Sequence, residues 1–396
     1  MALLGRLGRR LLPLVLVLGA FASVGVARPE PAGAAPATQP PQGYVLVDAA
    51  SGCQLAAKNE HQSFLTASTA KLLTAVTALE RLPLDSMVPV SALAAGQEES
   101  KINMKEGQVW KLDDALHSLL IVSANDAAFA IAERAGGSIP QFAKDADATA
   151  KELGAQNTTF GDPAGLDDRT SYSGGTHMSP YDLAVVARNA LAIPEIANTT
   201  KLLTYDFTDP TGTVRHLTNH NKGFLTTYPG AIGMKTGYTK AANRTLVTAA
   251  TRNGRTMIAV VMGTWDDTGW AGYLLDQGFT SAPAPCGAKL PPVRAVTADT
   301  RRQVFEGLPP ALGTPALDGG AAATVAGATT LTPPTTKPAK RAAAASSKQH
   351  DGTTSSTRTR AQIVDAQAAA ATRSTGGSSG FTLGTIFNLN VVVVVV

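Results

Sequence analysis

The sequence predicts a mixed α/β fold of the α+β type, with an antiparallel sheet flanked by helices and an additional helical subdomain. Helix patterns dominate residues 112–190, whereas β-branched residues and turn signals dominate the segment after residue 230. A second β-rich run begins near Gly43. Helices and strands that are segregated along the chain in this way are typical of α+β domains.

Two β-hairpins are expected. The first joins residues 44–47 to residues 53–57 across a Ser-Gly turn. The second joins residues 244–251 to residues 256–263, and Asn253-Gly254 lies between them. Asn-Gly between two β-rich runs is a strong hairpin signal, because both residues tolerate the positive φ that a tight turn requires.

The predicted helices differ in how deeply they are buried. Residues 68–82 lack Gly up to their end and are apolar on nearly every side, which predicts a buried helix. Further helices are expected where apolar periodicity is bounded by Pro or Gly, and the last of them should pack back on the sheet: Leu112–Val122, Asp126–Ala135, Pro140–Leu153, Pro180–Ala190 and Trp270–Gln277.

The two ends of the chain differ in composition from the predicted domain. Residues 1–27 combine three Arg with an apolar run and small residues, which indicates a secretory signal peptide; an uncleaved anchor is the alternative. Residues 28–41 predict a flexible spacer, and residues 283–380 a disordered low-complexity linker. The apolar tail, residues 381–396, is either a truncated membrane anchor or a segment without function. The protein is therefore expected to be exported.

Charge and cysteine content narrow the function classes. The net charge of +4 resides at the two ends and leaves about −3 for residues 28–310, so we expect no nucleic-acid partner.

The two cysteines, Cys53 and Cys286, could form a disulfide in an exported protein or remain as separate thiols. His216 and His220 have i, i+4 spacing but no helical pattern, so we interpret them as surface histidines. Neither a metal nor a cofactor is expected.

Ser68 and Lys71 are the first candidate site residues. Their i, i+3 spacing at the start of the predicted buried helix places both side chains on one face. A lysine can take the proton of a serine hydroxyl if burial and neighbouring cations favour its neutral form. The helix N-terminus also offers N–H groups to a developing oxyanion. Taken alone, the pattern equally fits Ser68 as a helix N-cap.

Two further motifs complete the candidate set. Ser123-Ala124-Asn125 falls between two predicted helices, where side chains can project into a cleft, although such residues are also common helix caps. Lys235-Thr236-Gly237 begins the β-rich region, where it could hold a carboxylate or form a turn with a solvated lysine. Each of the three motifs occurs once, in an order shared by penicillin-binding proteins and class A β-lactamases.

At these residues the chain resembles the low-molecular-mass penicillin-binding proteins, specifically the D-alanyl-D-alanine carboxypeptidases of the S11 serine peptidase family. The resemblance extends from about Gly43 to Phe279 and includes Asp162-Pro163-Ala164-Gly165-Leu166 and Tyr228-Pro229-Gly230. It implies a β-lactamase/penicillin-binding-protein-like catalytic domain over residues 42–282, with the active site between the sheet and the helical subdomain. It also implies a peptidoglycan stem peptide as substrate and β-lactams as covalent inhibitors.

The resemblance also implies residue roles. Ser68 would form the acyl-enzyme, Lys71 would be its general base, and Ser123 would relay a proton to the leaving D-alanine. The remaining residues would contact the substrate backbone, bind its terminal carboxylate and complete the oxyanion hole: Asn125, Lys235, Thr236, Gly237 and Tyr238.

Other functions remain open at the level of sequence. A β-lactamase shares the three motifs but needs a Glu-activated water, and the nearest run to its signature, Glu195-Ile196-Ala197-Asn198, lacks the expected Leu. A non-catalytic cell-wall or β-lactam sensor could use the same fold. The run Lys240-Ala241-Ala242-Asn243-Arg244 departs from the family pattern, which leaves the edge of the cleft and the fine specificity uncertain.

Overall fold

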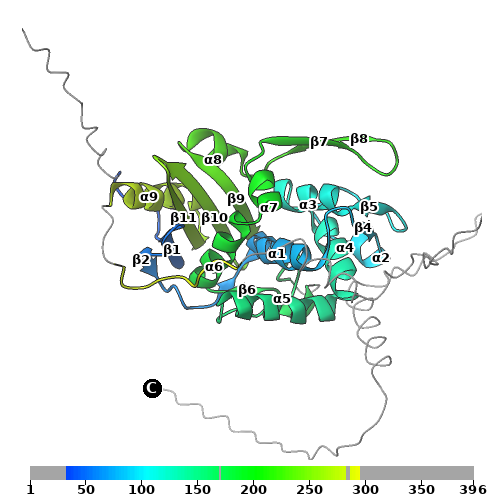
Figure 1. Ribbon diagram of the computed structural model, residues 1–396, viewed down its shortest axis with the longest axis horizontal. Helices are drawn as coiled ribbons and strands as arrows, with labels where there is room; N and C mark the ends of the chain where they lie inside the picture. The colour runs from blue at the N-terminus through cyan, green and yellow to red at the C-terminus, as the bar shows by residue number, and fades with distance from the viewer. Residues whose placement is uncertain (1–32, 169–170, 282–285, 295–396) are drawn as a thin grey trace, which may run out of the picture.

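The computed structural model describes residues 33–168, 171–281 and 286–294, and the predicted signal peptide, most of the linker and the apolar tail lie outside them. Its centre is a five-stranded antiparallel sheet in the order β2-β1-β11-β10-β9 (Figure 1). The strands are β1 (Gly43–Asp48), β2 (Gln54–Lys58), β9 (Ala231–Thr239), β10 (Asn243–Arg252) and β11 (Arg255–Thr264). The predicted sheet and both predicted hairpins are confirmed.

The hairpin of β10 and β11 shows why these residues form these elements. Arg252 pairs with Arg255, and Asn253 and Gly254 between them have φ of 50° and 75°. Positive φ at both turn positions matches the right-handed twist of the flanking strands, and Asn-Gly adopts it at little cost. The turn therefore fixes the register of the two central strands.

The sheet is buried on both faces. Residues alternate along the central strands: Val247 and Val260 join one apolar cluster, whereas Leu246 and Val261 join another. The second cluster packs against helix α9 (Asp267–Thr280), as predicted for a helix at this place. The first packs against α1 (Lys71–Arg81) and α6 (Pro180–Leu191) and continues into the helical subdomain.

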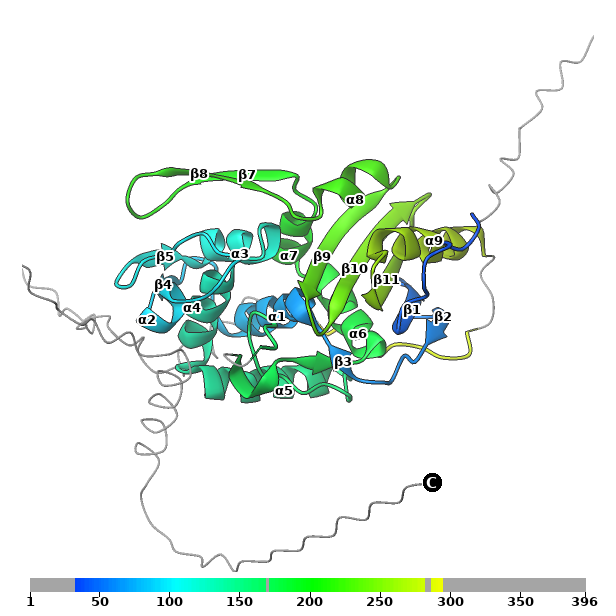
Figure 2. The ribbon, with the colours of Figure 1, turned by 180° about the vertical axis from the view of Figure 1, so that it is seen from behind.

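The helical subdomain lies beside the sheet, and α1 runs between the two (Figures 1 and 2). Its predicted helices are confirmed as α3 (Leu112–Ile121), α4 (Asn125–Gly136) and α5 (Ile139–Leu153), and the short α2 (Ala92–Ala95) precedes them in the chain. Gly137 and Gly154 end α4 and α5 in the left-handed conformation, which glycine adopts without a Cβ clash. The two glycines therefore determine where α4 and α5 end.

Several shorter elements were not predicted. A hairpin of β7 (Thr204–Thr208) and β8 (Val214–Thr218) extends along the helical subdomain beside α3 (Figure 1). Its four apolar residues are outnumbered by polar ones, and they fall in two short runs without a turn signal of the Asn-Gly type between them, so the sequence analysis did not predict the hairpin. The remaining elements are short: β3 (Phe64–Leu65) with β6 (His177–Met178), β4 (Met87–Pro89) with β5 (Val109–Lys111), α7 (Pro194–Thr200), α8 (Lys222–Thr227), and the 3-10 turns η1 (Ala67–Ala70) and η2 (Tyr172–Gly174).

The segment after α9 returns to the domain. Cys53 and Cys286 form a disulfide, which decides between the two alternatives that the sequence left open. Arg188 donates to the carbonyls of Ala49 and Pro291, and Arg294 pairs with Glu80. The packed part of the chain thus reaches Arg294, beyond the predicted domain boundary at residue 282.

Candidate active site

Ser68 lies within η1, immediately before α1. The Lys71 ammonium donates to the Ser68 hydroxyl at 2.8 Å, so the i, i+3 spacing brings the two groups into direct contact, as predicted. The N-cap interpretation of Ser68 is wrong, because Thr66 precedes η1 and the Ser68 hydroxyl points to Lys71 and to the Ala164 carbonyl. The serine is therefore held next to a potential base.

Lys71 is fully buried, and its Nζ has three hydrogen-bond partners. Besides Ser68, it donates to Asn125 Oδ1 at 2.8 Å and to the Ala164 carbonyl at 2.7 Å. Burial lowers the pKa of Lys71 well below its usual value, and the nearby charge of Lys235 lowers it further. Asp162 and Asp126 oppose this effect. The environment therefore favours the neutral amine that a general base requires.

Ser123 lies between α3 and α4 in a left-handed conformation, with φ of 61°. This conformation is costly for a residue with a Cβ and is found at functional sites more often than elsewhere. The Ser123 hydroxyl accepts from Lys235 Nζ at 2.9 Å, while Asn125 Nδ2 donates to the Glu98 carbonyl at 3.0 Å. Ser123 thus contacts Lys235, and Asn125 contacts Lys71 through its Oδ1, so each motif side chain meets a lysine of another motif.

Strand β9 supplies the opposite side of the site. Lys235 is buried, and this desolvation lowers its pKa to about 7. A Cβ on Gly237 would lie 2.9 Å from the Ser68 backbone nitrogen and 2.4 Å from Thr245 Oγ1. Glycine therefore allows β9 to lie directly against η1.

The predicted residues gather at a cleft of about 500 Å³. Those that line it directly are Ser68, Ser123, Thr236, Gly237 and Tyr238. Lys71, Asn125 and Lys235 lie behind this surface and contact it through the two serine hydroxyls. All eight predicted site residues are thus part of one connected arrangement.

The sequence missed other residues of the cleft. His220 and Arg244 line it, and burial followed by the charges of Lys235 and Lys71 lowers the pKa of His220. His220 is exposed, as predicted for a surface histidine, but the sequence did not show that it lies at the edge of the cleft, because its position depends on the unpredicted β8 and α8. His216 lies apart, exposed, with Nδ1 2.9 Å from Asp206 Oδ1. Among the described residues no cluster of three or more His, Cys, Asp or Glu is arranged to hold a metal.

A family model described as D-alanyl-D-alanine carboxypeptidase, peptidase S11, matches residues 31–266. The chain belongs to this S11 family of serine peptidases. It is 36% identical over 265 residues to the D-alanyl-D-alanine carboxypeptidase DacB2 of Mycobacterium tuberculosis, an alignment covering 64% of this chain and 88% of the relative. It is 33% identical over 224 residues to the D-alanyl-D-alanine carboxypeptidase DacF of Bacillus subtilis, an alignment covering 55% of this chain and 56% of that relative.

Solved structures of a D-alanyl-D-alanine carboxypeptidase and a DD-transpeptidase have the same fold. A crystal structure of a D-alanyl-D-alanine carboxypeptidase from Mycobacterium tuberculosis matches with a TM-score of 0.61 and 32% identity, covering 66% of this chain and 99% of that one. A Streptomyces DD-transpeptidase mutant matches with a TM-score of 0.57 and 26% identity, covering 62% and 99%. The penicillin-binding-protein-like fold that the sequence predicts is thus confirmed.

Proposed function

We propose that this S11 peptidase removes the terminal D-alanine from peptidoglycan stem pentapeptides through an acyl-enzyme on Ser68. The observation that supports this most strongly is the contact between the Ser68 hydroxyl and a buried lysine of lowered pKa. Relatives named D-alanyl-D-alanine carboxypeptidase supply the substrate class.

In the acylation step, Ser68 Oγ attacks the carbonyl carbon of the scissile peptide bond while neutral Lys71 takes the hydroxyl proton. The oxyanion of the tetrahedral intermediate accepts hydrogen bonds from the backbone N–H groups of Ser68 and Tyr238. When the intermediate collapses, the C–N bond breaks and a proton passes through Ser123 to the departing amine. Water then hydrolyses the ester and releases the shortened peptide.

Substrate orientation is assigned to the remaining motif residues. The Lys235 cation and the Thr236 hydroxyl would bind the terminal carboxylate, and Asn125 would hydrogen-bond the substrate backbone. Because the lowered pKa of Lys235 arises from desolvation, a bound carboxylate would favour its charged form. A β-lactam would acylate Ser68 in the same way, but its leaving group remains tethered, so the adduct persists.

The substrate and the disulfide both suit an exported protein. Structural disulfides persist in oxidising compartments, and the peptidoglycan substrate lies outside the cytoplasm. We therefore propose that residues 1–27 are a signal peptide. From their apolar composition we also propose that residues 381–396 associate with a membrane. Within residues 33–168, 171–281 and 286–294, no helix is both long and apolar enough to cross a bilayer.

The test compares wild type with Ser68→Ala on a stem pentapeptide and on a fluorescent penicillin. We expect the variant to lose both D-alanine release and covalent labelling. Full activity of the variant would contradict the mechanism. Rapid turnover of penicillin by wild type would favour the β-lactamase alternative, whereas peptide binding without D-alanine release would favour a sensor.

A further inference from the structure

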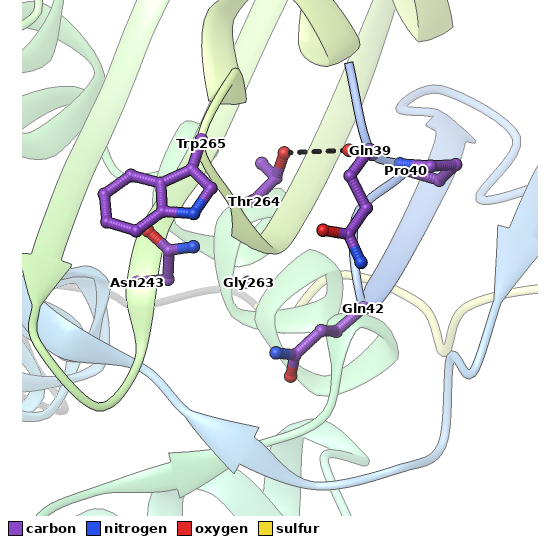
Figure 3. A pocket seen from close by; sticks show the side chains of 7 residues that line it. All are labelled: Gln39, Pro40, Gln42, Asn243, Gly263, Thr264 and Trp265. Atoms are coloured by element: carbon purple, nitrogen blue, oxygen red, sulfur yellow. Dashed lines mark hydrogen bonds between the residues drawn. The ribbon is translucent and has the colours of Figure 1, made fainter.

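A second cavity, of about 260 Å³, lies at the end of the sheet where β11 runs into α9. Figure 3 shows the Trp265 indole and the Asn243 amide on one side of it and the amides of Gln39 and Gln42 on the other. Pro40, Gly263 and Thr264 complete the lining. We call these seven residues the Trp265 pocket.

The Trp265 pocket is created by an irregularity in β11. The pairing of β10 with β11 shifts register so that Gly263 is an extra residue, and its φ is 68°. Such a bulge bends the strand and redirects the side chains that follow it. Trp265, two residues later, is 68% exposed, whereas Trp110 and Trp270 are almost fully buried. The bulge thus presents a large aromatic face to solvent.

The opposite wall is held in place by the chain that precedes β1. The Gln39 carbonyl accepts from Thr264 Oγ1 at 3.4 Å, and Gln42 N donates to the Gly263 carbonyl at 3.4 Å. Thr38 hydrogen-bonds with Asp266 and Trp270. These contacts use only backbone groups of the two glutamines. They place both side chains opposite Trp265 and leave the side-chain amides available to a ligand.

The pocket adjoins the active-site cleft. The Tyr238 ring lines that cleft, is 54% exposed, and lies 6.5 Å from the Trp265 ring, centroid to centroid. Asn243 lines the pocket, while the next residue, Arg244, lines the cleft. The two hollows therefore share a rim, formed by the run that departs from the family pattern.

The lining specifies the chemistry of a ligand. No residue of the Trp265 pocket is charged, whereas the neighbouring charges are engaged: Asp266 caps α9 through Gly269 N, and Arg244 pairs with Asp267. Three amide side chains offer both donors and acceptors, and an indole offers a flat apolar face. This combination fits a neutral sugar ring, whose hydroxyl and acetamido groups meet amides while its C–H face stacks on the indole.

We infer that the Trp265 pocket binds an N-acetylhexosamine unit and thereby lets the enzyme prefer stem peptides that are still attached to the glycan strand. The preference for attached peptides rests on the proposed function, whereas binding of the sugar does not. The volume of the Trp265 pocket suits a single sugar ring. The affinity for a free disaccharide is therefore expected to be weak, with a Kd on the order of 1 mM.

Binding is tested with the full chain carrying Ser68→Ala, which prevents turnover. Trp265 is the exposed one of the three tryptophans, so its fluorescence should change saturably on titration with diacetylchitobiose. The apparent affinity should fall at least threefold in Gln42→Ala and be unchanged in the control Gln156→Ala, an exposed glutamine that lines neither hollow. No saturable change, or a change with a neutral acetylated dipeptide amide but none with the sugar, would overturn the inference.

The preference is tested by comparing kcat/KM for a free pentapeptide and for the same peptide attached to its disaccharide. We expect Trp265→Ala to lower kcat/KM about three- to tenfold for the attached substrate and to leave the free peptide unchanged. Equal losses on both substrates would overturn the preference. If wild type cleaves neither substrate, the proposed function fails, and the titration still decides whether the pocket binds sugar.

Discussion

The interior of the active-site cleft and its outer rim differ in burial and in charge. In the interior, two buried lysines, Lys71 and Lys235, lie against serine hydroxyls, and burial lowers the pKa of both. At the rim, the Trp265 pocket is open, uncharged and lined by amides. The interior is suited to moving protons, and the rim to recognising a neutral group. Substitutions in the two regions should therefore change different quantities.

The largest effect is expected for Lys71→Met, which keeps an apolar chain of similar length but removes the base. General bases contribute about 10²- to 10⁴-fold, so we expect penicillin acylation to slow by about 10³-fold. Lys105→Met, which changes an exposed lysine outside the lining of the cleft, is the matched control and should change the rate less than twofold. Comparable rates for the two variants in stopped-flow labelling would disprove Lys71 as the base.

Ser123 should show a smaller loss, which can be separated from its backbone strain. Ser123→Gly removes the hydroxyl that contacts Lys235 and suits the positive φ, whereas Ser123→Ala removes the hydroxyl but keeps the strain. We expect both to slow D-alanine release about 10²-fold. Chemical denaturation should find Ser123→Ala about 1 kcal/mol less stable than Ser123→Gly. Unchanged release in either variant would exclude the proton relay.

The coupling of the two lysines predicts a shift in pH dependence. Lys235→Gln removes a charge that lowers the pKa of Lys71, so the acidic limb of penicillin acylation should move to higher pH. An acidic limb that stays in place would show that the lysines are not coupled.

The pH dependence of the free energy of unfolding tests the lowered pKa of Lys235 independently of activity. Between about pH 7 and its ordinary pKa of 10.5, Lys235 holds a proton in the unfolded chain but not in the folded protein. The free energy of unfolding of wild type should therefore rise with pH across this window, and the rise should be smaller in Lys235→Gln. Identical slopes would contradict the lowered pKa.

Features that depend on neighbouring residues in the chain could be predicted from the sequence, whereas features that depend on packing between distant segments could not. Gly137, Gly154 and Asn253-Gly254 act within one turn of the chain, so the helix ends and the hairpin were predictable. Ser68 and Lys71 were predictable because their contact depends on helical spacing alone. The α+β class and the three motifs thus followed from local patterns, whereas the family resemblance supplied Tyr238, the residue roles and the penicillin-binding-protein-like fold.

What the sequence could not predict depends on packing between distant segments. The Ala164 carbonyl that accepts from Lys71 is 93 residues away, and no side-chain pattern marks a carbonyl. His220 and Trp265 reach their positions through the β7–β8 hairpin, α8 and a register shift in β11, none of which a composition pattern reveals. The rim was therefore less predictable than the interior.

The central claim, that Ser68 is the nucleophile, is tested most directly by locating a penicillin adduct. Wild-type protein is incubated with benzylpenicillin, its intact mass is measured, and the modified peptide is sequenced by tandem mass spectrometry. We expect one adduct per chain, carried by Ser68 and absent from Ser68→Ala. An adduct on another residue, or an equal adduct in Ser68→Ala, would contradict it.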